Sequence, residues 1–303
     1  MTPVDFAELA VEGPWQHRHV SANGQRFHVA VAGRDDQPLV VLLHDVLQFW
    51  WAWRHQVPAL AEAGYRVAAM DLRGTGGSDK PPHGYDTPTL ATDVARVARS
   101  LGAERCVVVG SGTGAHVAWA AAALHDDVVR GVGALAAAHP LDALVAPMHV
   151  TSVRRLLTAM VPSVPERRLT DPLVVRRLLT AGSGRRGWPD QPTADRYARA
   201  LRVPFAAHSQ LEQLRWEVRS RPRLDGRRYL SALGRARPVP VLQVHGDRDP
   251  VRTPLAAELH RRSRAHAEPY RWELLPGVGR YPAEEAPELV TGLLLDWLPT
   301  VTP

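Results

Sequence analysis

The chain is poor in cysteine and in lysine, and it has no long uninterrupted hydrophobic run. Cys106 is the single cysteine among 303 residues, so no internal disulfide can form and the composition fits a reducing cytoplasm. Residues 1–14 lack the basic stretch and apolar run of a signal peptide. No segment approaches the roughly 18 uncharged apolar residues of a membrane span, so we expect no membrane partner.

Lys80 is the only lysine, so arginine carries almost all of the positive charge, a bias typical of GC-rich actinobacterial genomes. The net charge of +6 is unevenly placed, because residues 141–235 contain 18 arginines against 8 acidic residues. A basic segment of this kind could attract nucleic acid. Its arginine pairs are separated mainly by apolar residues without interleaved aromatics, which indicates a solvated helical surface instead. We expect no nucleic-acid partner.

Strand and helix patterns alternate along the first half of the chain. Alternating residues at 17–20 and 26–32 flank an Asn-Gly dipeptide, which predicts a hairpin. Apolar runs predict buried strands at 39–44, 65–71, 106–109 and 128–138. Helical patterns lie between them at 50–63, 89–101 and 115–124. Because strands that alternate with helices pair in parallel, the pattern predicts an α/β fold with a mostly parallel sheet.

The alternation stops at residue 140 and resumes at residue 239. Beyond that point we expect strands at 239–245 and 270–275 and helices at 254–264 and 287–298. The segment between is helical in pattern and is broken by prolines. The sequence therefore predicts a core of residues 1–140 and 236–303, with a helical cap of residues 141–235 inserted after the sixth strand.

Residues 107–114 read Val-Val-Val-Gly-Ser-Gly-Thr-Gly, an apolar strand running into a tight glycine turn before a helix. An α/β-hydrolase presents its nucleophile at such a turn, in the pattern G-x-S-x-G or G-x-D-x-G. On residues 110–114 the nucleophile position is Gly112, which has no side chain. The glycines also suggest a dinucleotide fingerprint, but the third glycine is missing and the strand is not the first. We expect neither a nicotinamide cofactor nor a metal.

Other motifs follow in order, and together they resemble the α/β-hydrolase superfamily, in particular its epoxide-hydrolase-like branch. Residues 44–47 stand where the family has H-G-x-P, and residues 71–79 look like its D-x-R-G-x-G-x-S-D loop. Residues 246–250 look like the turn that supplies the acid, here Asp249. Residues 277–282 look like the G-x-G-H-x-P turn, with Arg280 at the histidine position.

The resemblance implies a degenerate catalytic triad. The family mechanism needs a nucleophile, a histidine base held by a carboxylate, and N–H donors for the oxyanion. Gly112 cannot attack, and Arg280 carries only donors and cannot take up a proton near neutral pH. Asp45 replaces the glycine of the oxyanion motif, where a carboxylate facing the site would oppose a developing negative charge. We therefore do not expect hydrolysis by the family route.

Several groups could act instead. Asp249 and Arg280 either brace two loops as a salt bridge or form a catalytic unit, with Arg280 polarising a substrate oxygen and Asp249 or Asp45 acting as base. His44 is usually structural in the family, and we keep it as a catalytic candidate. Ser111 is the nearest hydroxyl to the nucleophile position, although it lies one residue too early in the turn.

The candidate substrate-binding residues surround the same turn. Gly112 either relieves backbone strain or opens space for a bulky ligand. Trp50 and Trp51 follow the oxyanion motif, and at least one is expected to line the cavity. Tyr197 and Tyr229 are the cap tyrosines, a residue type that the epoxide-hydrolase branch uses to hold the epoxide oxygen. Two further histidines, at positions 116 and 139, are expected to be packing or surface residues.

These observations favour a non-hydrolytic enzyme on a hydrolase scaffold. It would catalyse ring opening, cyclisation, isomerisation or carbon–carbon bond formation on an apolar aromatic or polyketide-like secondary metabolite, in natural product or antibiotic biosynthesis. One alternative is a non-catalytic ligand-binding pseudoenzyme. Another is a hydrolase that acts through Ser111 or an activated water. The expected partner is an apolar small molecule, the expected location is the cytoplasm, and homodimer formation is left open.

Overall fold

The computed structural model describes residues 4–145, 157–251 and 262–302. In this part of the chain, one sheet has the strand order β1-β2-β4-β3-β5-β6-β7-β8. The strands are β1 (Gln16–Ala22), β2 (Gln25–Ala32), β3 (Leu39–Leu43), β4 (Arg66–Met70), β5 (Cys106–Ser111), β6 (Val129–Leu135), β7 (Val239–Gly246) and β8 (Ala267–Leu275). β2 pairs antiparallel with β1 and β4, and the other recorded pairs are parallel. The predicted α/β class is confirmed.

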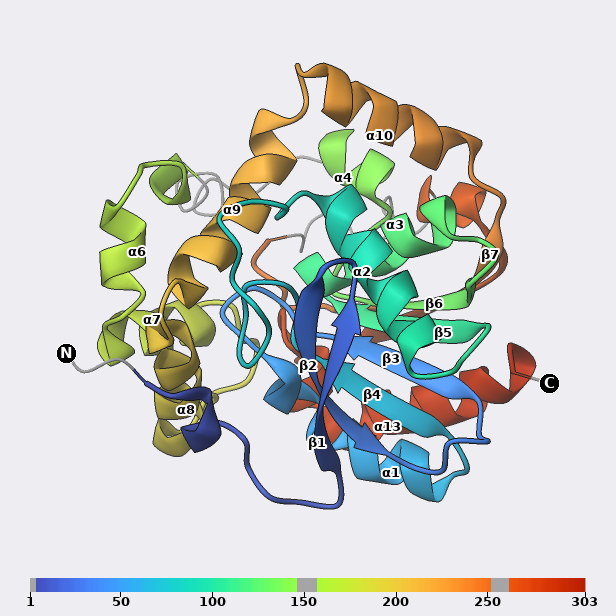
Figure 1. Ribbon diagram of the computed structural model, residues 1–303, viewed down its shortest axis with the longest axis horizontal. Coiled ribbons are helices and arrows are strands. Elements are labelled where there is room, and N and C mark those ends of the chain that lie inside the picture. The colour runs from blue at the N-terminus through green and yellow to red at the C-terminus, as the bar shows by residue number, and fades with distance from the viewer. Residues whose placement is uncertain (1–3, 146–156, 252–261, 303) are drawn as a thin grey trace.

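The central strands are buried on both faces, as their apolar runs predicted. In β3, Val40 and Leu42 pack in one hydrophobic cluster with α1 (Gln56–Glu62) and α13 (Pro287–Trp297). Val41 and Leu43 point to the other face. There they join a second cluster with α2 (Thr87–Ser100) and α3 (Thr113–Leu124). Figure 1 shows these two helix pairs on opposite sides of the sheet.

The segment between β6 and β7 is helical in its described part. It contains α4 (Pro140–Val145), α6 (Val164–Arg168), α7 (Pro172–Thr180), α8 (Gln191–Arg202), α9 (Ala206–Arg219) and α10 (Leu224–Arg235). Asp171 and Asp190 cap α7 and α8 by accepting a bond from a backbone N–H in the first turn. In Figure 1, α6 to α8 lie beside the sheet, and α9 and α10 continue past α2 and α3. We call this segment the cap.

One expected helix differs from the sequence prediction, and a second one lies largely outside the described residues. The helix expected over 50–63 is divided into η2 (Trp50–Trp53) and α1. The helix expected over 254–264 lies largely outside the described residues and is not tested, and the 3-10 helix η4 (Arg264–His266) precedes β8. The remaining short helices are η1 (Phe6–Glu8), α12 (Pro282–Glu285) and η5 (Leu298–Thr300).

Cys106 opens β5 and is buried, and this burial raises the pKa of its thiol to about 12. The thiol is therefore protonated at neutral pH and unreactive, as the sequence suggested. None of the helices in the described residues is both long enough and apolar enough to cross a lipid bilayer.

Candidate functional site

The turn between β5 and α3 depends on three glycines. Gly112 has φ 53° and ψ −114°, a backbone conformation that residues with a side chain rarely adopt. A Cβ on Gly110 would lie 2.2 Å from the carbonyl oxygen of Gly114. A Cβ on Gly114 would lie 2.5 Å from the carbonyl oxygen of Leu43 at the end of β3. The glycines therefore bring the N-terminus of α3 against the end of β3, where the loop carrying Asp45 begins.

The carboxylate of Asp45 lies where a side chain on Gly112 would begin. A Cβ built on Gly112 would be 2.0 Å from Cγ of Asp45 and 2.1 Å from each of its carboxylate oxygens. These distances are far below van der Waals contact, so the two side chains exclude one another. Asp45 is fully buried. The interpretation of Gly112 as open space for a ligand is wrong, because a carboxylate of the protein fills that space.

Two backbone N–H groups and a hydroxyl hold this carboxylate. Asp45 Oδ1 accepts hydrogen bonds from the backbone N–H of Val46 at 2.8 Å, the N–H of Thr113 at 2.8 Å and the Thr113 hydroxyl at 3.1 Å. Thr113 is the first residue of α3, where the helix dipole also favours a negative charge. In the α/β-hydrolase fold the N–H after the nucleophile position serves the oxyanion. Here the donor at that position is bonded to Asp45.

Arg280 completes the site by pairing with Asp45. Its Nε donates to Asp45 Oδ2 at 2.9 Å, and a terminal nitrogen donates to Oδ1 at 3.4 Å. Burial disfavours the cation, but the carboxylates of Asp45 and Asp249 outweigh it and raise the pKa of Arg280. The guanidinium is therefore charged throughout the neutral range and cannot accept a proton.

Asp249 lies close enough to Arg280 to contribute to this shift, and it is itself buried. Its Oδ1 accepts a hydrogen bond from the backbone N–H of Val251 at 2.8 Å. The ion pair that the described residues record for Arg280 is formed with Asp45. From the sequence we expected Asp249 to be the salt-bridge partner of Arg280, and we did not predict a salt bridge with Asp45.

His44 has a structural position. Its Nε2 accepts a hydrogen bond from the backbone N–H of Leu72 at 3.2 Å, so the ring proton is on Nδ1, which donates to the carbonyl oxygen of Asp45 at 2.9 Å. Burial lowers its pKa, which keeps the ring neutral. Both ring nitrogens bond backbone groups, so His44 has no free nitrogen for proton transfer and the catalytic role expected for it is wrong. The ring instead joins two loops and orients the backbone at Asp45.

The cap also fixes the Asp45 loop. Gln210 on α9 accepts a hydrogen bond from the backbone N–H of Leu47 at 2.6 Å and donates to the carbonyl oxygen of Gln48 at 3.1 Å. Leu47 has φ 70°, an unfavourable conformation for a leucine that needs such support. The loop that carries Asp45 is therefore bound to the core through His44 and to the cap through Gln210.

A cavity of about 420 Å³ lies between the core and the cap. This volume is within the usual range for small-molecule sites. Its core side includes Val46, Thr113 and Arg280, which are the neighbours or partners of Asp45. Most of the rest is aliphatic, including Ala136, Ala137, Ala138, Leu169, Leu178, Leu211 and Leu214. The wall therefore suits an apolar ligand, with charge confined to a few positions.

The cavity contains some of the predicted binding residues and lacks others. Tyr229 on α10 lines it, and burial, followed by the charge of Glu217, raises the pKa of its hydroxyl. Gly112 and Ser111 are buried below the wall and do not line it. At this turn the neighbouring residue Thr113 lines the cavity instead.

Trp50, Trp51 and Tyr197 also lie away from the cavity wall. Trp50 is fully buried, with its ring 5.3 Å from that of Trp15. Trp51 stacks under the guanidinium of Arg54 at 3.7 Å, and its ring is 5.8 Å from that of Tyr197. Trp50 therefore packs in the core and Trp51 packs against the cap, which corrects the expectation that one of the two tryptophans borders the cavity.

A histidine and a glutamate that the sequence did not assign to the site meet in the cavity wall. Nδ1 of His116, in the first turn of α3, is 2.9 Å from Oε1 of Glu217 on α9. Both residues line the cavity. The position of His116 four residues after Gly112 was a usable signal, but Glu217 could not be located because the cap could not be aligned residue by residue.

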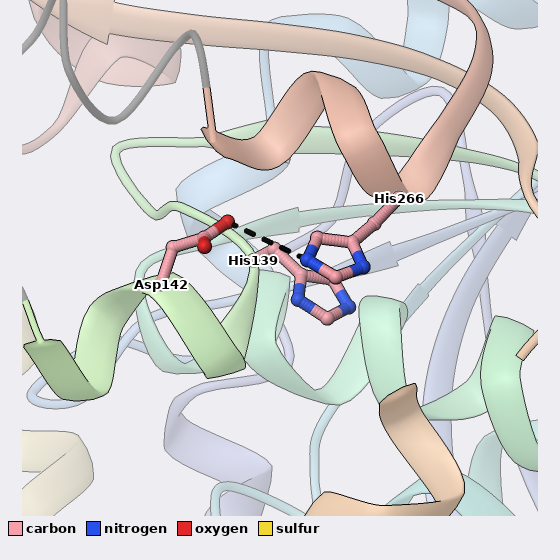
Figure 2. A group of neighbouring side chains, drawn as sticks. All are labelled: His139, Asp142 and His266. Atoms are coloured by element: carbon pink, nitrogen blue, oxygen red, sulfur yellow. Dashed lines mark ion pairs between the residues drawn. The ribbon is translucent and has the colours of Figure 1, made fainter. Parts of the chain in front are cut away.

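Figure 2 shows a second group of ionisable side chains, His139, Asp142 and His266. Each offers a ligand atom, and these atoms lie within 4.8 Å of one another. The two imidazole rings stack with centroids 3.8 Å apart and planes 13° apart. Nitrogen lone pairs lie in the ring plane, so those of two parallel rings run side by side and do not converge on one ion. In this geometry the three residues form a stacked pair beside a carboxylate.

Burial, together with the charges of His266 and His116, lowers the pKa of His139 to about 2. Its ring also meets Trp119 edge-on at 4.8 Å. His139 is therefore a neutral packing residue, as the sequence suggested.

The alpha/beta hydrolase fold family model matches residues 38–287. The chain is 32% identical to epoxide hydrolase A of Mycobacterium tuberculosis over 93% of this chain and 96% of that protein. The crystal structure of epoxide hydrolase A from Mycobacterium thermoresistibile is 27% identical, with a TM-score of 0.79 over 94% of this chain and 98% of that one. An epoxide hydrolase from an endophytic Streptomyces gives 25% identity and a TM-score of 0.81, over 95% and 96% of the two chains. The chain therefore belongs to the α/β-hydrolase family, and epoxide hydrolases are among its relatives.

Proposed function

We propose that this protein is a small-molecule enzyme that acts on an apolar ligand in the cap–core cavity without forming a covalent intermediate. The observation that carries the proposal is the position of the Asp45 carboxylate. It fills the space of a side chain at Gly112 and binds the N–H groups of Val46 and Thr113. The same carboxylate therefore removes both the room for a nucleophile and the donors for an oxyanion.

Arg280 supports the same conclusion. A covalent ester would have to be hydrolysed by water, and this step needs a base at the histidine position. The guanidinium has only donors and is held as a cation by Asp45. Thus attack at position 112, oxyanion stabilisation and activation of water by the residue at the histidine position are each unsupported, and we propose that the triad is degenerate.

The lining and volume of the cavity indicate a class of ligand and do not identify a single compound. Its aliphatic wall fits an aromatic or polyketide-like molecule, and its volume of about 420 Å³ fits a compound of drug-like size. Ring opening, cyclisation, isomerisation or carbon–carbon bond formation on such a metabolite needs acid–base groups and no nucleophile of the protein. We propose a role of this kind in natural product biosynthesis, in the cytoplasm.

A non-catalytic binding protein is the second candidate, and one observation favours it. The charges of Asp45 and Arg280 neutralise one another in a buried pair, so neither charge by itself requires a catalytic explanation. In this alternative the cavity holds a ligand and the protein does not transform it.

The protein should not hydrolyse styrene oxide or p-nitrophenyl acetate above the rate of a heat-inactivated sample. Asp45 is buried and bonded on both oxygens, and Arg280 cannot act as base. Diol formation by chromatography and nitrophenolate absorbance are the measurements. A hydrolysis rate that Ser111→Ala abolishes would establish the displaced serine as nucleophile and contradict the proposal.

The cavity should bind a neutral aromatic probe such as N-phenyl-1-naphthylamine with saturable fluorescence. Leu214→Trp places a larger side chain in the cavity wall and should weaken binding by at least about tenfold, or about 1.4 kcal/mol. Leu173→Trp is the matched control, because Leu173 is 60% exposed and outside the wall. Equal affinity in both variants would show that the probe binds elsewhere.

A further inference from the structure

The cavity wall holds a histidine–carboxylate pair whose two members come from different parts of the chain. His116 is on α3, one turn after the glycine turn, and Glu217 is on cap helix α9. His116 Nδ1 and Glu217 Oε1 are 2.9 Å apart. The two side chains are 19% and 27% exposed, and both line the cavity. A ligand enclosed by the cap would therefore be in reach of this pair.

We propose that His116 is the general acid–base residue of the cavity and that Glu217 is its positioning residue. This inference rests on the proposed function, because it assigns residues to a non-covalent reaction in that cavity. The bond to Glu217 places the proton of the neutral ring on Nδ1 and leaves the Nε2 lone pair to accept a proton. The carboxylate then stabilises the imidazolium that forms, as in a triad without its nucleophile.

The electrostatic surroundings agree with this assignment. Glu217 is close enough to Tyr229 on α10 that its charge, after burial, helps to raise the pKa of that hydroxyl. His116 is close enough to His139 to help lower the pKa of that ring. Tyr229 and His139 therefore stay uncharged near neutral pH, and Glu217 is the charged group that contacts His116. Among the described residues around His116, no arginine or lysine is recorded in contact with Glu217.

A cavity that contains a general base and no nucleophile of the protein favours reactions that proceed by proton transfer. Where a ligand has a C–H bond next to a carbonyl group, His116 Nε2 would accept that proton. The C–H electron pair becomes the carbon–carbon double bond of an enolate, and the carbonyl oxygen takes the negative charge. Where this enolate is conjugated with a second carbon–carbon double bond, return of the proton from His116 to the far carbon of the dienolate re-forms the carbonyl group and gives an isomer in which the double bond has moved. No oxidant, water or second substrate is consumed, so the step balances with the residues of the cavity.

The test uses 5-nitrobenzisoxazole, a small neutral aromatic compound that reports base catalysis directly. Removal of its C3 proton by His116 forms a nitrile as the N–O bond breaks, and the product is the coloured 2-cyano-4-nitrophenolate. The protein should show saturable turnover that N-phenyl-1-naphthylamine inhibits. His116→Gln should lower this turnover by about 10²-fold or more, with the affinity for N-phenyl-1-naphthylamine unchanged.

Glu217→Gln tests the positioning role separately. It keeps a hydrogen-bonding group near His116 and removes the charge, so the rate should fall about tenfold. The midpoint of the rate–pH profile should shift to lower pH, because the imidazolium loses its counter-charge. A purely structural contact would leave that midpoint in place. His208→Gln is the matched control, because His208 is on the same helix, 46% exposed and outside the wall, and it should retain the parental rate.

The outcomes separate this inference from the proposed function. Failure of both aromatic compounds to bind would contradict the proposed cavity function itself. Binding without turnover would overturn the assignment of His116 and leave the cavity as a binding site. A rate that His116→Gln leaves intact, in a protein with parental circular dichroism and probe affinity, would do the same.

Discussion

A triple variant with Asp45→Gly, Gly112→Asp and Arg280→His should hydrolyse styrene oxide at least about 10²-fold faster than a heat-inactivated sample, a background that the parent protein should not exceed. The first change frees the N–H groups of Val46 and Thr113, which now bond the Asp45 carboxylate. The second supplies a nucleophile at a turn that already has the required backbone conformation, with φ 53°. The third supplies a base. Chromatographic measurement of the diol tests the result.

The double variant that leaves Asp45 in place is the informative control. A Cβ at position 112 would lie 2.0 Å from Cγ of Asp45, so Gly112→Asp with Arg280→His forces two carboxylates into one space. We expect this variant to be inactive and less stable than the parent. Diol formation by the double variant at the rate of the triple would show that Asp45 can leave its position, and it would contradict the central observation of the site.

The fold could be predicted largely from the sequence because its signals are local. Continuous apolar runs mark strands buried on both faces, and β3, β4 and β5 lie where those runs predicted. The glycine turn at 110–114 was equally readable, since only residues without a side chain permit the approach of α3 to β3. The error at residues 50–63 was one of element type, because aromatic residues at helical spacing also fit a 3-10 turn.

The positions of the unusual residues could be predicted, and their contacts could not. Asp45, Gly112 and Arg280 were identified as departures from the family pattern, but a salt bridge between Asp45 and Arg280 and a contact between Asp45 and Gly112 were not predicted. Motif spacing states which loop a residue occupies but gives no information on the direction of its side chain. The structure shows that the three residues are in contact, since Asp45 occupies the space beside Gly112 where a side chain would begin and pairs with Arg280.

The His116–Glu217 pair illustrates a different limit. One partner lies in the core and the other lies 101 residues later in the cap. Contacts of this range depend on how the cap helices pack over the core, and no local pattern in the sequence encodes that packing. The positions of Trp50 and Trp51 were predicted wrongly for a related reason. A tryptophan buried in the core and one that lines a cavity give the same sequence signal.

Arg280→Met should lower the free energy of unfolding by about 3 kcal/mol. Asp45 is fully buried, and its side chain would keep its charge without its cationic partner. The three remaining donors, from Val46 and Thr113, stabilise that charge in part and keep the loss near the lower end for a broken buried pair. Urea denaturation followed by circular dichroism gives the difference. Arg221→Met, an exposed position on the same cavity, should change stability by less than about 0.5 kcal/mol.

Removing both charges should restore most of the loss. With Asp45→Gly and Arg280→Met combined, neither an unpaired carboxylate nor an unpaired guanidinium is left in the interior, and stability should return to within about 1 kcal/mol of the parent. The interaction energy from the four proteins then measures the pair itself. An additive cycle, with the double variant as unstable as the sum of the single variants, would show that Arg280 stabilises the fold through packing and that its bond to Asp45 contributes little.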